Sequence, residues 1–183
     1  PMGVQPYCFF VDIAGAVKQA VSIPVSTAGR IIDPVMAENV LQSGKADMVG
    51  LGRPLLADPD WANKTAAGRA DDIRRCISCN KGCTDNIQNR AFIACVLNSE
   101  NGYEETRLIT PAIAPKNVVV IGGGPAGLEA ARVAAIKGHS VTLFEKETEL
   151  GGQLNIAGVP PRKIETCRAV ENLVHAVSTE GVT

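Results

Sequence analysis

The amino-acid sequence predicts a mixed α/β protein, in which short apolar strands alternate with helices. Two observations lead to this class. In the first third of the chain, two apolar runs about 25 residues apart are each followed by a glycine and a helix, as in parallel-sheet units. In the last third, a strand runs into G-x-G-x-x-G and a helix of small residues follows. Both segments therefore favour parallel strands with connecting helices.

Composition and charge narrow the class of protein. The chain has 183 residues, 45% of them hydrophobic, and its 18 basic and 19 acidic residues nearly cancel. This balance gives no electrostatic case for nucleic acid or an anionic membrane. No apolar run reaches the ~20 residues of a membrane span, and the N-terminus has no signal-peptide pattern. We expect a cytoplasmic protein that binds neither nucleic acid nor membrane.

The elements of the first part follow from apolar periodicity, helix-start signals and glycine stops. A helix start is strongest where aspartate precedes proline, because aspartate caps the helix and proline fits its first turn. The expected elements are a helix at 11–21, a strand at 22–27, a helix at 33–44, a strand at 46–51 and a helix at 58–68.

Each of the two strands ends in a glycine followed by an arginine, Gly29–Arg30 and Gly52–Arg53. Glycine lets backbone N–H groups approach an anion, and a guanidinium clamps it, so the pairs indicate a phosphate site. In a TIM barrel, the loops after the last two strands commonly form such a site. The alternative is that both glycines only make turns and both arginines are solvated or in structural ion pairs.

Four of the six cysteines lie close together as C-x2-C-x3-C-x11-C, namely Cys76, Cys79, Cys83 and Cys95. Thiolates bind soft metals, and this spacing favours one iron–sulfur cluster. Zinc is the main alternative, although structural zinc sites usually show two separated cysteine pairs or a histidine pair. Disulfides or free thiols are the third, and they are disfavoured in a reducing cytosol. Cys8 and Cys167 stand apart and are interpreted as small buried hydrophobic residues.

A polar, proline-bearing stretch at 98–116 indicates a linker, after which a second domain begins. Its fingerprint consists of Gly122 for the tight turn, Gly124 for close approach of a pyrophosphate, and Gly127 for helix packing. Glu145, 23 positions after Gly122, is placed to bind a ribose. A glycine-rich turn without ligand is the alternative. A second glycine pair, Gly151–Gly152, precedes Gln153 and favours FAD over NAD as the dinucleotide.

Taken in order, the motifs G-R, G-R-P-x-x-A-D-P, C-x2-C-x3-C-x11-C, V-V-V-I-G-G-G-P-A-G and G-G-Q resemble the iron–sulfur flavoenzymes of the old yellow enzyme superfamily. The likeness is to NADH:flavin oxidoreductases of the 2,4-dienoyl-CoA reductase and 2-enoate reductase type, with trimethylamine dehydrogenase as a relative. It implies the C-terminal part of an FMN-binding TIM barrel, an iron–sulfur segment and the first βαβ of a Rossmann-like FAD-binding domain. The expected boundaries are 1–70, 71–115 and 116–183.

The resemblance also implies roles for individual residues. Gly29, Arg30, Gly52 and Arg53 correspond to the FMN-phosphate loops, and the four clustered cysteines to the ligands of a 4Fe-4S cluster. The positions that correspond to FAD contacts are Gly122, Gly124, Pro125, Ala126, Glu145, Gly152 and Gln153. In such enzymes electrons pass from NAD(P)H through FAD and the cluster to FMN, which reduces an activated C=C bond of an enoate or enoyl-CoA.

The family enzymes are several times longer, so the chain is expected to be an internal fragment, inactive alone. A complete barrel has eight strand–helix units, whereas two are visible here. The acid–base residues would precede this chain, so no catalytic residue is assigned. An oligomer is compatible with the sequence. The alternative functions are an amine dehydrogenase of the same architecture and a stand-alone zinc- and dinucleotide-binding module without catalysis.

Overall fold

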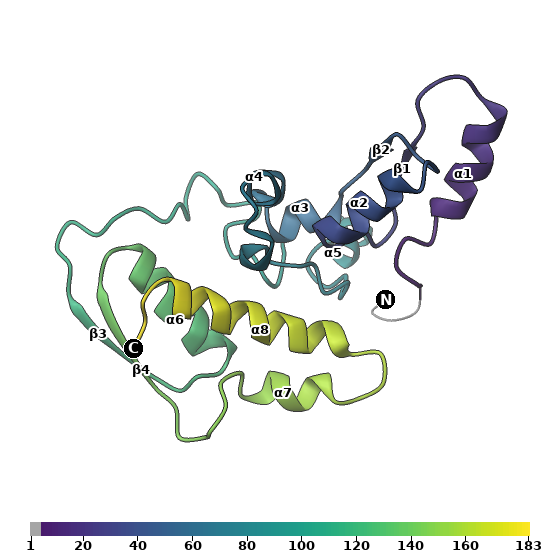
Figure 1. Ribbon diagram of the computed structural model, residues 1–183. Coiled ribbons are helices and arrows are strands. Elements are labelled where there is room, and N and C mark those ends of the chain that lie inside the picture. Colours follow the sequence, from purple (N-terminus) through teal and green to yellow (C-terminus); the bar gives the residue numbers. More distant parts are fainter. Residues whose placement is uncertain (1–4) are drawn as a thin grey trace. The chain divides into compact units, whose positions relative to one another are not determined.

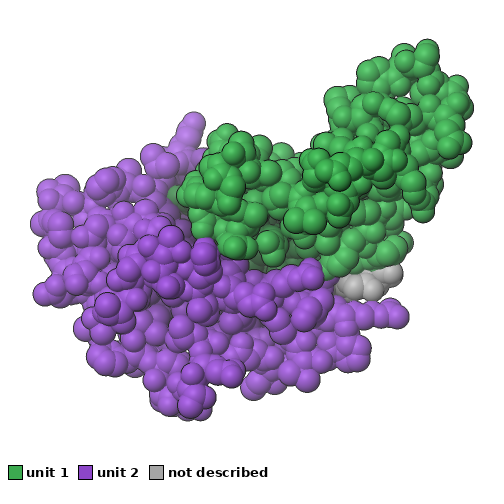
Figure 2. Space-filling view, in the orientation of Figure 1, with its two compact units in different colours: residues 1–101 green, residues 102–183 purple. Residues whose placement is uncertain are grey.

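The computed structural model describes residues 5–183 and contains two compact units, which divide between residues 101 and 102 (Figure 2). The mixed α/β class is confirmed, because each unit contains parallel strands and helices. The expected segments 1–70, 71–115 and 116–183 stay a prediction. The first four residues lie outside the described part, and the unit boundary falls inside the middle segment.

The first unit contains two short parallel strands, and a helix follows each (Figure 1). Its strands pair Ser26 with Met48 and Thr27 with Val49. The elements are α1 Val11–Ala20, β1 Ser26–Thr27, α2 Pro34–Gln42, β2 Met48–Val49, α3 Arg53–Ala57, α4 Trp61–Ala66, the 3-10 turn η1 Ala70–Asp72 and α5 Thr84–Gln88. Because the strands are parallel, their carboxyl ends meet at one edge, and both Gly–Arg pairs follow at that edge.

Helix α2 forms as predicted, and its start shows why. The side chain of Asp33 accepts a hydrogen bond from the Met36 N–H at 2.9 Å, and Pro34 occupies the first turn. Val11, Ile31, Val40 and Ala46 form the buried apolar cluster of this region. Ile31 of this cluster anchors the backbone directly after the first Gly–Arg pair.

Four elements differ from the sequence prediction. Both strands are shorter than expected, and the short helix α3, not predicted, begins at Arg53 itself. The helix expected at 58–68 begins only at Trp61, because Asp58 is extended and its carboxylate caps no helix. Asp58 instead makes tertiary hydrogen bonds, which no local pattern reveals.

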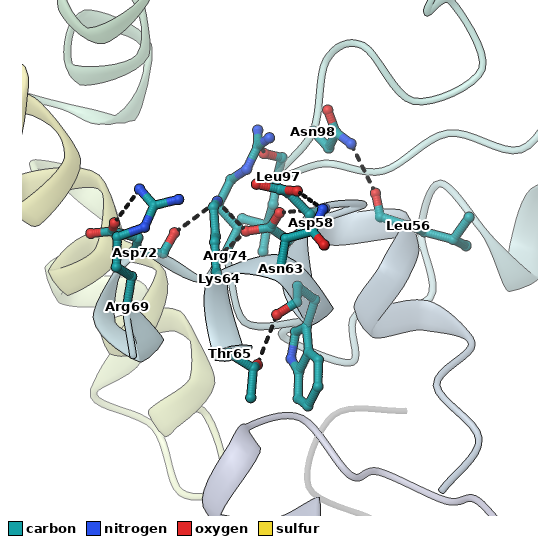
Figure 3. Close-up of polar contacts among 12 residues, drawn as sticks. Leu56, Asp58, Asn63, Lys64, Thr65, Arg69, Asp72, Arg74, Leu97 and Asn98 are labelled. Atoms are coloured by element: carbon teal, nitrogen blue, oxygen red, sulfur yellow. Dashed lines mark hydrogen bonds and ion pairs between the residues drawn. The ribbon is translucent and has the colours of Figure 1, made fainter. Parts of the chain in front are cut away.

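The Asp58 carboxylate is the centre of a buried polar network (Figure 3). The residue is 1% exposed and accepts hydrogen bonds from the Lys64 ammonium at 2.7 Å and from the backbone N–H groups of Arg74 and Asp60 at 2.9 and 3.1 Å. The Arg74 guanidinium continues the network to the Leu97 carbonyl at 3.0 Å. Asp58 thus fixes α4 and the start of the cysteine loop to each other.

Replacing Asp58 by alanine is expected to lower the free energy of unfolding by about 3 kcal/mol, because the Lys64 ammonium, whose side chain is 17% exposed, loses its carboxylate. Chemical denaturation measures the change. The matched control is Asp60→Ala, two residues away. Its carboxylate accepts a hydrogen bond from the exposed side-chain amide of Asn63. We expect this substitution to lower the free energy of unfolding by less than about 1 kcal/mol. Equal effects of the two substitutions would contradict this role of Asp58.

The second unit contains a strand, helix, strand arrangement followed by two helices (Figure 1). Its parallel strands pair over five positions, from Asn117 with Ser140 to Ile121 with Phe144. The elements are β3 Asn117–Ile121, α6 Pro125–Ile136, β4 Ser140–Phe144, α7 Gln153–Gly158 and α8 Ile164–Thr179. Residues of α6, β4 and α8 form the buried core of this unit, namely Leu128, Ala131, Val141 and Val177.

Residues 181–183 lie alongside β4. The N–H of Leu143 donates to the Thr183 carbonyl at 2.7 Å, and the N–H of Thr183 donates to the Val141 carbonyl at 3.1 Å. Because alternate residues of a strand bond to opposite sides, Thr183 pairs with the edge of β4 that faces away from β3.

Between residues 5 and 183, no helix combines the length and the apolar character needed to cross a membrane.

Candidate cofactor and metal sites

The two Gly–Arg pairs line a single cavity in the first unit, which we call the Gly–Arg pocket. The pocket lies at the carboxyl ends of β1 and β2, and its lining includes Gly29, Arg30, Gly52 and Arg53. The structure therefore brings together the residues that the sequence singled out for phosphate. Two guanidinium-bearing residues on one cavity suit an anion with several oxygens.

Gly29 and Arg30 are held in a conformation that few residues adopt. Gly29 has φ +111°, and a Cβ there would lie 2.9 Å from the Phe9 ring. Arg30 has φ +53° and is 9% exposed. Its guanidinium lies over the Tyr7 ring, 4.5 Å from the centroid, and donates to the Gln5 carbonyl. Because these neighbours already fix the Arg30 side chain, it would lose little conformational entropy on binding a ligand.

The four clustered cysteines line a second cavity of the same unit, which we call the cysteine pocket. Its remaining walls are largely apolar, with Leu56, Ile77, Val96 and Leu97 among them. An apolar wall limits solvent access and so affects the redox potential of a metal centre. The sequence-predicted ligand set Cys76, Cys79, Cys83 and Cys95 is thus gathered at one place.

A glycine explains how Cys95 reaches the other three cysteines. The N–H of Ala94 donates to the Gly82 carbonyl at 2.6 Å. A Cβ on Gly82 would lie 2.5 Å from the Ala94 carbonyl oxygen, so a side chain at position 82 would push residues 94–95 away. The N–H of Asn98 then donates to the Cys95 carbonyl at 3.2 Å, and the Asn98 amide donates to the Leu56 carbonyl at 3.0 Å (Figure 3).

The chemistry of this donor set fits an iron–sulfur cluster. Within residues 5–183, no group of three or more His, Cys, Asp or Glu side chains is close enough to hold a single metal ion. Four thiols that line one cavity suit a cluster, in which each thiolate binds its own iron.

Burial raises the pKa of the Cys76 and Cys95 thiols above the ordinary value. At Cys76, the backbone N–H of Ser78 and the charge of Arg53 act in the opposite direction. The hydrogen bond from the Ser78 N–H to the Cys76 sulfur measures 3.4 Å. Both thiols are therefore protonated at neutral pH without metal, and binding of iron must release protons.

In the second unit, the glycine loop between β3 and α6 has the geometry of a pyrophosphate cradle. Gly122 has φ +102°, and a Cβ on Gly122 or Gly124 would meet no atom of the chain within 4 Å. These glycines leave open space where a ligand can contact the backbone. Gly127 has the opposite environment, since a Cβ there would lie 1.9 Å from the Gly122 carbonyl oxygen. Pro125 and Ala126 form the first turn of α6.

Glu145, at the end of β4, contacts this loop directly. Its carboxylate accepts hydrogen bonds from the backbone N–H groups of Gly123, at 2.6 Å, and Glu147, at 2.9 Å. The Glu147 and Gly123 N–H groups hold the pKa of Glu145 below its usual range. The carboxylate is ionised at neutral pH and is in the position that the fingerprint gives to the ribose-binding residue.

The second glycine pair lies against the first loop. The N–H of Gly151 donates to the Gly123 carbonyl at 2.8 Å, and a Cβ on Gly152 would lie 3.1 Å from the Gly124 Cα. Gln153 begins α7. All of the positions predicted to contact FAD therefore lie on or beside the glycine loop.

Sequence reasoning missed several residues of the two pockets in the first unit. Phe9, Ser78 and Thr84 line the Gly–Arg pocket, and Asn80 and Gly82 line the cysteine pocket. Ser78, Asn80 and Gly82 lie between cysteines, which was the only available signal. Cys8 and Cys167, which the sequence analysis interprets as buried, are half-buried. Cys167 packs closely against Gly158, since a Cβ on that glycine would lie 2.3 Å from the Cys167 sulfur.

Comparison with protein families finds matches for both ends of the chain. Residues 10–72 match the NADH:flavin oxidoreductase / NADH oxidase family, and residues 117–180 match the FAD dependent oxidoreductase family. The matched ranges include the Gly–Arg pairs and the glycine loop with Glu145.

Curated proteins and a solved structure are similar over most of the chain. The bilirubin reductase of Mediterraneibacter gnavus is 62% identical over 95% of this chain and 27% of its own length. The cinnamate reductase of Clostridium sporogenes is 47% identical over 80% of this chain and 22% of its own length. A 2-naphthoyl-CoA reductase in complex with 2-naphthoyl-CoA has a TM-score of 0.95 and 30% identity, over 100% of this chain and 28% of that one. The chain spans about a quarter of the length of these proteins.

Proposed function

We propose that this chain, whose residues 10–72 match the NADH:flavin oxidoreductase / NADH oxidase family and whose residues 117–180 match the FAD dependent oxidoreductase family, is the electron-transfer segment of a longer alkene reductase. In that enzyme NAD(P)H supplies electrons through FAD and a 4Fe-4S cluster to FMN, which reduces an activated C=C bond. The proposed substrates are enoates or enoyl-CoA thioesters. Cinnamate, named for one relative, is an enoate, and naphthoyl-CoA, bound by another, is an aroyl-CoA thioester.

One observation carries the proposal. The Gly–Arg pocket and the cysteine pocket share part of their lining, so a cavity with two arginines lies next to a cavity with four thiols in one unit. A cluster that carries single electrons is useful only close to its redox partner. Neither a solitary zinc module nor a simple dinucleotide-binding protein needs this arrangement.

The chain's own residues bind and orient in this proposal. Gly29, Arg30, Gly52 and Arg53 hold the phosphate of FMN, and the four cysteines hold the cluster. The glycine loop holds the pyrophosphate of FAD, and the Glu145 carboxylate accepts a hydrogen bond from the adenosine ribose of FAD. None of these groups moves a proton in the reaction, so the proposed catalytic acid or base lies in other residues of the enzyme.

Anaerobic expression of the complete gene tests the proposal. We expect about four irons and four sulfides per polypeptide, together with FMN and FAD, and reduction of cinnamate by NADH or NADPH. One zinc without sulfide would instead indicate the stand-alone module. Full cofactor content with oxidation of amines and no reduction of enoates would indicate the amine dehydrogenase.

A further inference from the structure

The Gly–Arg pocket and the cysteine pocket have two lining residues in common, Arg53 and Cys76. The wall between the pockets therefore carries a cation and a thiol. Arg30, the other arginine of the phosphate site, lines the first pocket and is not part of the second. The two arginines are equivalent in the sequence pattern but differ in what they face.

The Arg53 side chain is docked onto the cysteine loop. Its Nη1 donates to the Asn80 side-chain oxygen at 2.6 Å, and Asn80 lies between Cys79 and Cys83. The Thr84 hydroxyl donates to the same oxygen at 3.4 Å. Asn80 has φ +64°, a conformation that asparagine tolerates better than most residues. The guanidinium is thus held half-buried, where water screens its charge less than at the surface.

A fixed positive charge beside four thiolates has a direct electrostatic consequence. Arginine stays protonated throughout the accessible pH range. A nearby cation stabilises the more negative of two oxidation states, which for an iron–sulfur cluster is the reduced one.

We propose that Arg53 acts on both cofactors: it binds the phosphate of FMN and raises the reduction potential of the cluster. The inference rests on the proposed function, which supplies the two cofactors. Arg53 is a positioning and tuning residue, because its charge acts through space and takes no part in bond making. Electron transfer between the cluster and the flavin then depends on a residue of the phosphate site.

The test uses the complete protein with Arg53→Gln, Arg53→Lys and, as the matched control, Arg30→Gln. Two quantities are measured: the midpoint potential of the cluster in flavin-free protein, by a redox titration followed by electron paramagnetic resonance, and the Kd of FMN. Riboflavin, which lacks the phosphate, is bound in parallel.

Arg53→Gln is expected to lower the cluster potential by about 59 mV, a tenfold change in the relative stability of its two oxidation states. It is also expected to weaken FMN binding about ten- to a hundredfold and to leave riboflavin binding unchanged. Arg53→Lys keeps the charge and loses the planar fork, so it should keep the potential and weaken FMN binding. Arg30→Gln should weaken FMN binding and keep the potential.

An unchanged potential in Arg53→Gln, or an equal drop in Arg30→Gln, would overturn the proposal. If Arg53→Gln does not assemble its cluster, Asn80→Ala, which releases the Arg53 guanidinium from the cysteine loop, decides: a fall in potential supports the proposal and a wild-type potential contradicts it. A wild-type protein without cluster or FMN would refute the proposed function itself, which is a different result from any of these.

Discussion

Cys79→Ala in the complete protein is expected to abolish the iron–sulfur cluster and to stop the reduction of FMN by NAD(P)H, while FMN stays bound. Cys79 is one of four thiols on the cysteine pocket, and it does not line the Gly–Arg pocket. Three remaining thiolates leave one iron without its protein ligand. Iron and sulfide content, flavin content and stopped-flow reduction of each flavin measure the three parts of this result.

Cys167→Ala is the matched control for Cys79→Ala. Cys167 is also a free, half-buried thiol, but it lies on α8 of the second unit and packs against Gly158. We expect normal cluster content and normal FMN reduction in this variant. Reduction of FMN at the wild-type rate in the Cys79 variant would show that the cluster is not the route between the flavins.

Gly127→Ala is expected to prevent FAD binding and to lower the stability of the second unit by about 3 kcal/mol. The added methyl group would lie 1.9 Å from the Gly122 carbonyl oxygen, so α6 must move away from β3. The pyrophosphate cradle is formed by this same turn and cannot survive the movement. FAD content and chemical denaturation measure the two effects.

Gly124→Ala separates the two effects of Gly127→Ala. Gly124 has φ −73°, which alanine adopts freely, and its Cβ would meet no atom of the chain. The variant should fold with wild-type stability and still lose FAD, because the methyl group occupies the space left for the ligand. FAD bound normally to Gly124→Ala would mean that the dinucleotide does not approach this glycine. FMN and cluster content should stay normal in both variants.

Local patterns were sufficient where structure is determined by near neighbours in sequence. The cap at Asp33, the strand before Gly122 and the helix after it were predicted because capping and periodicity act within a few residues. The cysteine spacing also predicted a common site, since three of the ligands lie within eight consecutive residues. Their gathering around one pocket agrees with that prediction.

The sequence could not show features that depend on distant contacts. Asp58 has the pattern of a helix start, but hydrogen bonds to Lys64 and Arg74 keep it extended, and α4 begins later. Gly82 has no local reason to be a glycine, and its requirement comes from Ala94. Arg53 could not be distinguished from Arg30 because the cysteine loop reaches it only in the folded chain.

The hydrogen bonds that hold Cys95 in place have a consequence for repair. They join Ala94 to Gly82 and Asn98 to Leu56, and none of them uses a thiol sulfur. Cys95, the proposed fourth ligand, is therefore held at the pocket by hydrogen bonds that do not require iron, so binding iron would order little additional chain. If the proposed cluster were lost to oxygen, a site preformed in this way would let the same chain take up a new one without unfolding.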